Sequence, residues 1–286
     1  MKGDKMKIGF IGAGKVGFSL GKYFSENNID ISGFYSRNYE SAKEAADFTG
    51  SFPYDNTSDL INDSDAIFIT VPDGQIKKVF EELPADSLTG KMICHCSGAM
   101  TAEEAFPDIS DDNAYGFSIH PLFPISSKYE SYKELKNAFF CLEGNLEKID
   151  LWSELLSGMG NNVKVISDSN KVHYHAACAI ASNLVCALID ESASLMEDCG
   201  FTYGESLKAL APLVLCNVKN ILDRDPVSAL TGPVERNDIE TVRKHLECIK
   251  EDSDRDVYVA ASRKLISLAQ KKHPEIDYSD MKDLLK

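Results

Sequence analysis

The sequence predicts a Rossmann-like, doubly wound α/β domain with a mostly parallel sheet, followed by an all-α domain. Three observations lead to this fold class. Apolar runs alternate with helical patterns up to about residue 168, a glycine-rich turn follows the first run, and strand signals then stop. Strand–helix alternation is typical of a parallel sheet covered on both faces, whose buried strands are apolar throughout. The predicted domains are residues 1–168 and 169–286.

The first predicted domain contains apolar, β-rich runs that we expect to be strands, with amphipathic stretches between several of them. The expected strands are Met6–Ile11, Ile31–Tyr35, Ala66–Val71, Met92–Cys96, Tyr115–His120, Ala138–Leu142 and Val163–Ile166, and the expected helices include Val16–Ser25, Glu40–Phe48, Ile76–Leu83 and Leu146–Leu156.

The second predicted domain is helical, with expected helices at Asn170–Cys199, Tyr203–Leu222, Ile239–Ile249 and Asp254–Gln270. We expect Pro212 to kink or split the second helix, because proline lacks the N–H that an interior turn requires. Asp238 and Ser253 are expected to cap the third and fourth helices. The polar tail after Lys272 predicts a short peripheral helix.

The composition excludes several classes of protein. With 286 residues, 43% apolar and 26% charged, the chain can build a sizeable core. Its 45 acidic against 30 basic residues give a net charge of -15, which disfavours nucleic acid and anionic membrane surfaces as partners. We expect no membrane span, because no apolar run reaches about 18 residues. The eight cysteines lack metal-ligand spacing, so we expect no metal and buried free thiols in the cytoplasm.

The first apolar run ends in Gly12-Ala13-Gly14-Lys15-Val16-Gly17, which reads G-x-G-x-x-G. This pattern is weak alone, but here it follows a strand and opens a helix, as a dinucleotide-binding turn requires. Gly12 allows the tight turn, Gly14 lets the backbone approach a pyrophosphate, and Gly17 lets the helix pack closely on the strand. The free N–H groups of the helix N-terminus then bind the phosphates.

The residues after the second expected strand favour NADP(H) over NAD(H). An NAD site usually carries an acidic residue about 20 residues after the glycines. Ser36 and Arg37 stand there instead, and a guanidinium matches a 2′-phosphate. A solvated Arg37 and an S-adenosylmethionine site are the alternatives. Val71, Pro72 and Ser97 are expected to complete the cofactor site.

Ligands of an open parallel sheet bind outside the carboxyl ends of its strands. Ser97 and His120 follow the fourth and end the fifth expected strand, so we expect both near a nicotinamide ring and its substrate. The alternatives are a turn for Ser97 and a backbone hydrogen bond for His120. Asp73 is expected to cap the next helix, and His95 to be buried in its strand.

A second group of polar residues opens the first long helix of the second predicted domain. At about 100° per residue, Lys171 and His175 share a face, and Asn183 lies beside it. We expect this face to line an interdomain cleft, the alternative being a solvated first turn. Thr231 and Arg236 either form a turn or point into the same cleft, where Arg236 would hold a substrate carboxylate.

These residues resemble the 6-phosphogluconate-dehydrogenase-like superfamily of NAD(P) reductases, and most closely a branch with its own helical C-terminal domain. Ketopantoate reductases, pyrroline-5-carboxylate reductases and β-hydroxyacid dehydrogenases belong to this superfamily. The motifs that carry the resemblance are Gly12–Gly17, His95–Ala99, Ile119–Leu122, Lys171 with Tyr174–Ala177 and Asn183, and Leu230–Pro233.

The resemblance implies an NADPH-dependent reductase of a small 2-oxo acid, with ketopantoate as the first guess, and a homodimer. Lys171 or His175 would stabilise the developing alkoxide, with Asn183 as a second donor and Ser97 and His120 nearby. Better-known members place Asn four residues after the catalytic lysine, whereas His175 stands there in this chain. An imine reductase resembling pyrroline-5-carboxylate reductase, a non-catalytic NADP(H) sensor and a structural protein with an empty cleft are the alternatives.

Overall fold

The computed structural model describes residues 6–286. The chain separates into two compact units, one ending at Cys178 and one beginning at Ala179. This division lies beyond residue 168 because the helix that starts at Lys171 first packs against the sheet, where the Lys171 side chain is fully buried. The predicted fold class, a Rossmann-like sheet unit followed by helices, is confirmed.

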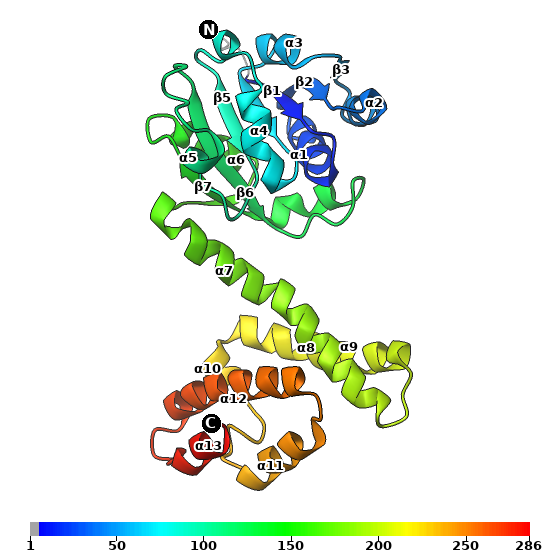
Figure 1. The fold of residues 1–286 in the computed structure, drawn as a ribbon, viewed down its shortest axis with the longest axis vertical. Helices are drawn as coiled ribbons and strands as arrows, with labels where there is room; N and C mark the ends of the chain where they lie inside the picture. Colours follow the sequence, from blue (N-terminus) through cyan, green and yellow to red (C-terminus); the bar gives the residue numbers. More distant parts are fainter. Residues whose placement is uncertain (1–5) are drawn as a thin grey trace. The chain divides into compact units, whose positions relative to one another are not determined.

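The first unit contains an eight-stranded sheet with the order β3-β2-β1-β4-β5-β6-β7-β8 (Figure 1). The pairs are parallel except for β6 with β7. The strands are β1 Lys7–Ile11, β2 Asp30–Tyr35, β3 Phe52–Tyr54, β4 Ala66–Ile69, β5 Met92–His95, β6 Tyr115–Leu122, β7 Phe139–Gly144 and β8 Asn162–Val165.

Helices cover both faces of this sheet, as the continuous apolar strands require. One buried cluster joins the sheet to Phe18 of α1, Ala42 of α2 and Trp152 of α6. The other joins it to Leu60 of α3 and Ile76 of α4. The helices of this unit are α1 Lys15–Glu26, α2 Tyr39–Thr49, α3 Thr57–Asn62, α4 Asp73–Glu81, α5 Ala102–Ala105 and α6 Ile149–Gly158, and α7 Lys171–Ala181 leads out of it.

The second unit is helical, and part of its own core comes from the end of the chain. Its helices are α8 Asn183–Glu197, α9 Tyr203–Asp223, α10 Pro226–Ala229, α11 Ile239–Cys248, α12 Asp252–Lys272 and α13 Ser279–Leu284. The predicted short helix after Lys272 is confirmed as α13, but Tyr278 and Met281 are fully buried against α11 and α12, so its expected peripheral position was wrong.

Several local predictions need correction. The expected long helix is divided at Ser182, which leaves the helical conformation. Pro212 does not split α9, which is continuous through it. Asp238 caps α11 through the Thr241 N–H, as predicted, whereas Ser253 lies inside α12. All eight cysteines are free, but four of them are exposed rather than buried.

Candidate functional site

The glycine-rich turn between β1 and α1 has the geometry that its sequence predicts. Gly12 has φ +111°, a conformation that favours glycine. A Cβ on Gly17 would lie 2.5 Å from the Gly12 carbonyl oxygen, so only glycine lets α1 approach the turn. The Thr70 hydroxyl, after β4, donates to the same carbonyl at 2.8 Å and fixes the turn.

The N-terminus of α1 is open to an anionic ligand. Gly14 is the extended N-cap residue and provides no side-chain cap, so the first N–H groups of α1 lack the usual hydroxyl or carboxylate partner. No acidic residue stands in the first turn. The helix dipole and these free donors make the turn suited to a phosphate.

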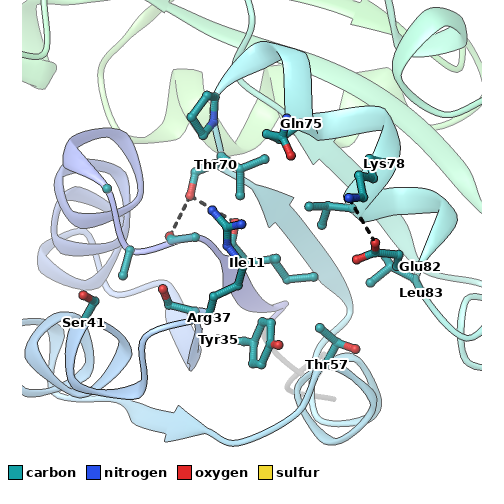
Figure 2. Close-up of a pocket in the computed structure, with 17 residues that line it drawn as sticks. Ile11, Tyr35, Arg37, Ser41, Thr57, Thr70, Gln75, Lys78, Glu82 and Leu83 are labelled. Carbon is teal, nitrogen blue, oxygen red and sulfur yellow. Dashed lines mark hydrogen bonds and ion pairs between the residues drawn. The ribbon is translucent and has the colours of Figure 1, made fainter.

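A cavity of about 510 Å³ lies over this turn at the carboxyl ends of β1, β2 and β4. Figure 2 shows Arg37 pointing into it from beyond the end of β2. Seven of the predicted cofactor residues line it: Gly12, Ala13, Gly14, Ser36, Arg37, Val71 and Pro72. Lys15, Val16, Gly17 and Ser97 are not among its lining residues, so their contacts with a cofactor stay predictions.

Sequence reasoning missed part of the cavity wall. Ser41 stands beside Ser36 and Arg37, where a second hydroxyl would bind a phosphate oxygen. Tyr35, Thr57, Val79 and Leu83 also line the cavity and make its wall partly apolar. Isolated residues of α2, α3 and α4 carry no motif, so only the fold brings them to the cavity.

One hydrogen bond connects this cavity to the next strand end. Asp73 follows Pro72 directly, and its Oδ2 accepts from the Ser97 hydroxyl at 2.6 Å. Asp73 is the first residue of α4 rather than its cap, which corrects the prediction. The Ser97 Oγ also accepts from the N–H groups of Ala99 and Met100. Ser97 therefore stabilises its own turn and, by its hydrogen bond to Asp73, connects that turn to the edge of the cavity at Pro72.

The Ser97 turn brings two imidazoles together over Gly98. A Cβ on Gly98 would lie 2.8 Å from His175 Nδ1 and 3.0 Å from His120 Nε2. His120 is half-buried at the end of β6, and His175 is exposed on α7. The structure therefore brings together Ser97, His120 and His175 in one unit, as the sequence predicts of the strand ends and of α7.

Lys171 belongs to this group but lies beneath it. Its side chain is fully buried, and its Nζ donates to the Ser118 hydroxyl. Ser118 in turn donates to the Ser97 carbonyl at 3.2 Å. Burial lowers the pKa of the Lys171 ammonium, and the nearby Glu143 carboxylate opposes that shift. The lysine therefore supports the Ser97 turn from inside the domain.

Burial keeps the imidazoles of His120 and His95 neutral near pH 7. Burial, with the Lys171 and His175 charges, lowers the pKa of His120 to about 4. Burial lowers the pKa of His95 to about 3, and its Nδ1 accepts from the Ser97 N–H at 3.1 Å. His95 is thus a buried part of the turn, as expected.

The remaining predicted residues lie outside this group. Asn183 begins α8 in the second unit, and Thr231 and Arg236 belong to the turn before α11, where Gly232 has φ +106°. Their catalytic or binding roles stay predictions. Within residues 6–286, no group of three or more His, Cys, Asp or Glu side chains could hold a metal ion.

Two family models match the chain. Residues 7–97 match the family described as "NADP oxidoreductase coenzyme F420-dependent", and residues 138–265 match the "Domain of unknown function (DUF2520)". No curated protein matches.

Solved structures match over nearly the whole chain. A protein of Thermotoga maritima is 24% identical with a TM-score of 0.72, covering 93% of this chain and 99% of that one. An imine reductase from Pseudomonas sp. is 19% identical (TM-score 0.66; 93% and 98% covered). A reductive aminase from Aspergillus terreus, solved with NADPH and ethyl-5-oxohexanoate, is 16% identical (TM-score 0.65; 99% and 100% covered).

The chain therefore carries an NADP oxidoreductase domain joined to a DUF2520 domain. The predicted class, an NADP-dependent oxidoreductase, and the predicted cofactor, NADP(H), are confirmed. The TM-scores of these solved structures establish a shared fold. Their low sequence identities leave the substrate of this chain undetermined.

Gly98→Ala should separate catalysis from cofactor binding. The new methyl group would displace the two imidazoles, whereas the phosphate turn lies on other residues. We expect at least a 10-fold loss of NADPH-dependent turnover and less than a twofold change in NADPH affinity, measured by fluorescence titration. Gly74→Ala is the control, because a Cβ there meets nothing within 4 Å. Wild-type turnover in Gly98→Ala would contradict this assignment.

Proposed function

We propose that this protein is an NADPH-dependent reductase that transfers hydride to the carbonyl of a small 2-oxo acid, with 2-dehydropantoate (ketopantoate) as the first substrate to test. The observation that carries the proposal is the Asp73–Ser97 hydrogen bond. It joins the edge of the cofactor cavity, at Pro72, to the turn on which His120 and His175 converge. A cofactor and a proton-donating group thus meet within the same unit.

The cavity supports NADPH rather than NADH. The pyrophosphate would bind at the N–H groups that open α1, and the 2′-phosphate at Ser36, Arg37 and Ser41. No carboxylate stands at residues 36–38 to repel that phosphate or to hold a free ribose hydroxyl.

The chain's own residues would stabilise the charge that develops on the substrate oxygen. When bound, NADPH would supply a hydride to the carbonyl carbon, and negative charge would develop on the carbonyl oxygen. We expect that oxygen to accept hydrogen bonds from His120 and His175, whose ring nitrogens converge beside Gly98. The proton comes from His175 or from water. Lys171 is proposed to act by holding Ser118 and the Ser97 turn, and Asn183 stays proposed as a second donor.

Reduction of a small imine is the second candidate, and the burial of Lys171 favours it. The alkoxide that develops on an oxo acid is stabilised by a nearby cation, yet the lysine in this cluster is enclosed and bonded to Ser118. An iminium carries its own positive charge, which the exposed Asp73 carboxylate would stabilise. An NADP(H)-binding sensor without turnover is the third candidate.

The rate of NADPH oxidation with 2-dehydropantoate, beside 1-pyrroline-5-carboxylate and an NADH control, tests the proposal. Oxidation with the oxo acid and NADPH supports the first candidate, and oxidation with the imine alone supports the second.

Arg37→Ala should raise the KM for NADPH at least 10-fold and leave the KM for NADH within twofold, because only NADPH offers a 2′-phosphate. Equal effects on both cofactors would contradict the role of Arg37. NADPH binding without turnover on either substrate would indicate the sensor.

We also propose that the protein is a homodimer held by α8 and α9. Both helices leave apolar side chains uncovered along most of their length, including Leu215, Val218 and Leu222 at i, i+3 and i+7 of α9. Leu222 is 79% exposed, which is costly for a surface in water. The stretch Asp168–Glu197 is also long and apolar enough to span a membrane by length and composition alone. The acidic chain and its oxidoreductase domain favour a second copy as the cover.

Leu215→Glu should convert the dimer into a monomer, because a carboxylate would be buried in an apolar interface. The measurement is light scattering after size-exclusion chromatography without detergent, with a dimer expected at twice 31.5 kDa. Leu146→Glu is the matched control, since Leu146 is at least as exposed as Leu215 (81% against 69%) but lies in the sheet unit. A monomeric wild-type protein, or one that stays insoluble without detergent, would contradict the proposal.

The proposed location is the cytoplasm. All eight cysteines are free, including the buried Cys94 and Cys141, as expected in a reducing compartment.

A further inference from the structure

Tyr174 on α7 makes a direct hydrogen bond to the ring of His120 on β6. The Tyr174 hydroxyl lies 2.6 Å from His120 Nδ1, and the two rings meet edge to face with centroids 5.6 Å apart. Tyr174 stands three residues after Lys171, on the same side of the helix, so this side of α7 packs against the sheet. Tyr174 belongs to one of the motifs that carry the family resemblance, but the sequence assigns it no role and the proposed function gives it none.

The surroundings decide which partner donates in this hydrogen bond. If Nδ1 carried the proton, the Tyr174 hydrogen would need another acceptor. The groups within its reach are the thiols of Cys141 and Cys178, and sulfur is a weak acceptor. A bare imidazole nitrogen is the best acceptor available, so the hydroxyl donates to Nδ1 and the ring proton sits on Nε2.

Neither partner ionises near pH 7 to reverse this arrangement. Burial raises the pKa of the Tyr174 hydroxyl, and burial with the neighbouring Lys171 and His175 charges lowers the pKa of His120 to about 4. Asp73, the one acidic group that acts on His120, opposes this only weakly. The pair is therefore a neutral tyrosine bonded to a neutral imidazole.

The other nitrogen of His120 faces the place where the substrate would react. Nε2 lies 3.0 Å from the position that a Gly98 Cβ would occupy, next to His175 Nδ1. Within residues 6–286, Nε2 has no hydrogen-bond partner among the interactions of the structure. A proton on this nitrogen is thus an unused hydrogen-bond donor beside Gly98.

We propose that Tyr174 is a positioning residue that fixes the Nε2–H tautomer of His120, so that this N–H donates to the oxygen or nitrogen atom of the bond being reduced. The inference rests on the proposed function for the identity of that acceptor. His120 keeps its proton throughout, because losing it would leave an imidazolate or a tyrosinate. The proton that completes the product therefore arrives from His175 or water, and His120 stabilises the developing charge as a fixed neutral donor.

The tautomer is measured without any turnover. In ¹⁵N-histidine-labelled protein, protonated and bare ring nitrogens have well-separated shifts, and His120→Gln assigns the His120 signals. We expect a protonated Nε2 and a bare Nδ1 in the wild type, and a mixture of tautomers in Tyr174→Phe. Tyr54→Phe is the control, because it also loses one hydroxyl hydrogen bond, to Asp63, but leaves His120 untouched. A protonated Nδ1 in the wild type, or an unchanged tautomer in Tyr174→Phe, would overturn the inference.

Turnover gives a second, independent readout. Tyr174→Phe should lower kcat about 10-fold with NADPH affinity unchanged, since neither the tautomer nor the ring position of His120 is then fixed. In His120→Gln the donor is an amide N–H, which has no ring tautomer for Tyr174 to fix. Adding Tyr174→Phe to His120→Gln should therefore change kcat less than twofold. Additive losses would contradict the positioning role. If the wild type turned over no substrate, the proposed function would fail while the tautomer measurement still tested Tyr174.

Discussion

The arrangement of the site depends on the hydrogen bond between the Ser97 hydroxyl and the Asp73 carboxylate. Asp73 continues the strand end that lines the cofactor cavity, and Ser97 begins the turn that supports two imidazoles. A hydrogen bond to a charged group contributes about 1.5–3 kcal/mol. That is enough to hold two adjacent loops in one register, and hence to set the position of His120 and His175 relative to a bound dinucleotide.

The buried Lys171 supports this register from below. Enclosing an ammonium group in a protein costs several kcal/mol unless it is paired, and here Ser118 and the nearby Glu143 carboxylate offset that cost. The chain of contacts from Lys171 through Ser118 reaches the Ser97 carbonyl, so the turn is held on both sides. Lys171, which the sequence suggests as a catalytic cation, thus contacts the Ser97 turn through Ser118 in this structure.

Much of this molecule could be predicted from its sequence, and the exceptions have physical causes. The Gly12–Gly17 turn is predictable because each glycine is required by local steric crowding. The sequence did not predict β3, because this strand is only three residues long, contains Pro53 and lies at the sheet edge. Helical periodicity puts Lys171 and His175 on one face of α7. It does not reveal that Lys171 is buried against the sheet unit whereas His175 is exposed. The roles of Tyr174 and Ser41 could not be predicted, because only the fold brings Tyr174 to His120 and Ser41 to the cavity.

The account is tested most directly by turnover and NADPH affinity in Asp73→Ala, beside Asp73→Asn, which keeps an acceptor for Ser97. If the link holds the imidazoles in place, Asp73→Ala should lower kcat about 10-fold while the Kd for NADPH changes less than threefold, and Asp73→Asn should retain most of the activity. Wild-type turnover in Asp73→Ala would contradict the account, because the two loops would then keep their register without this hydrogen bond.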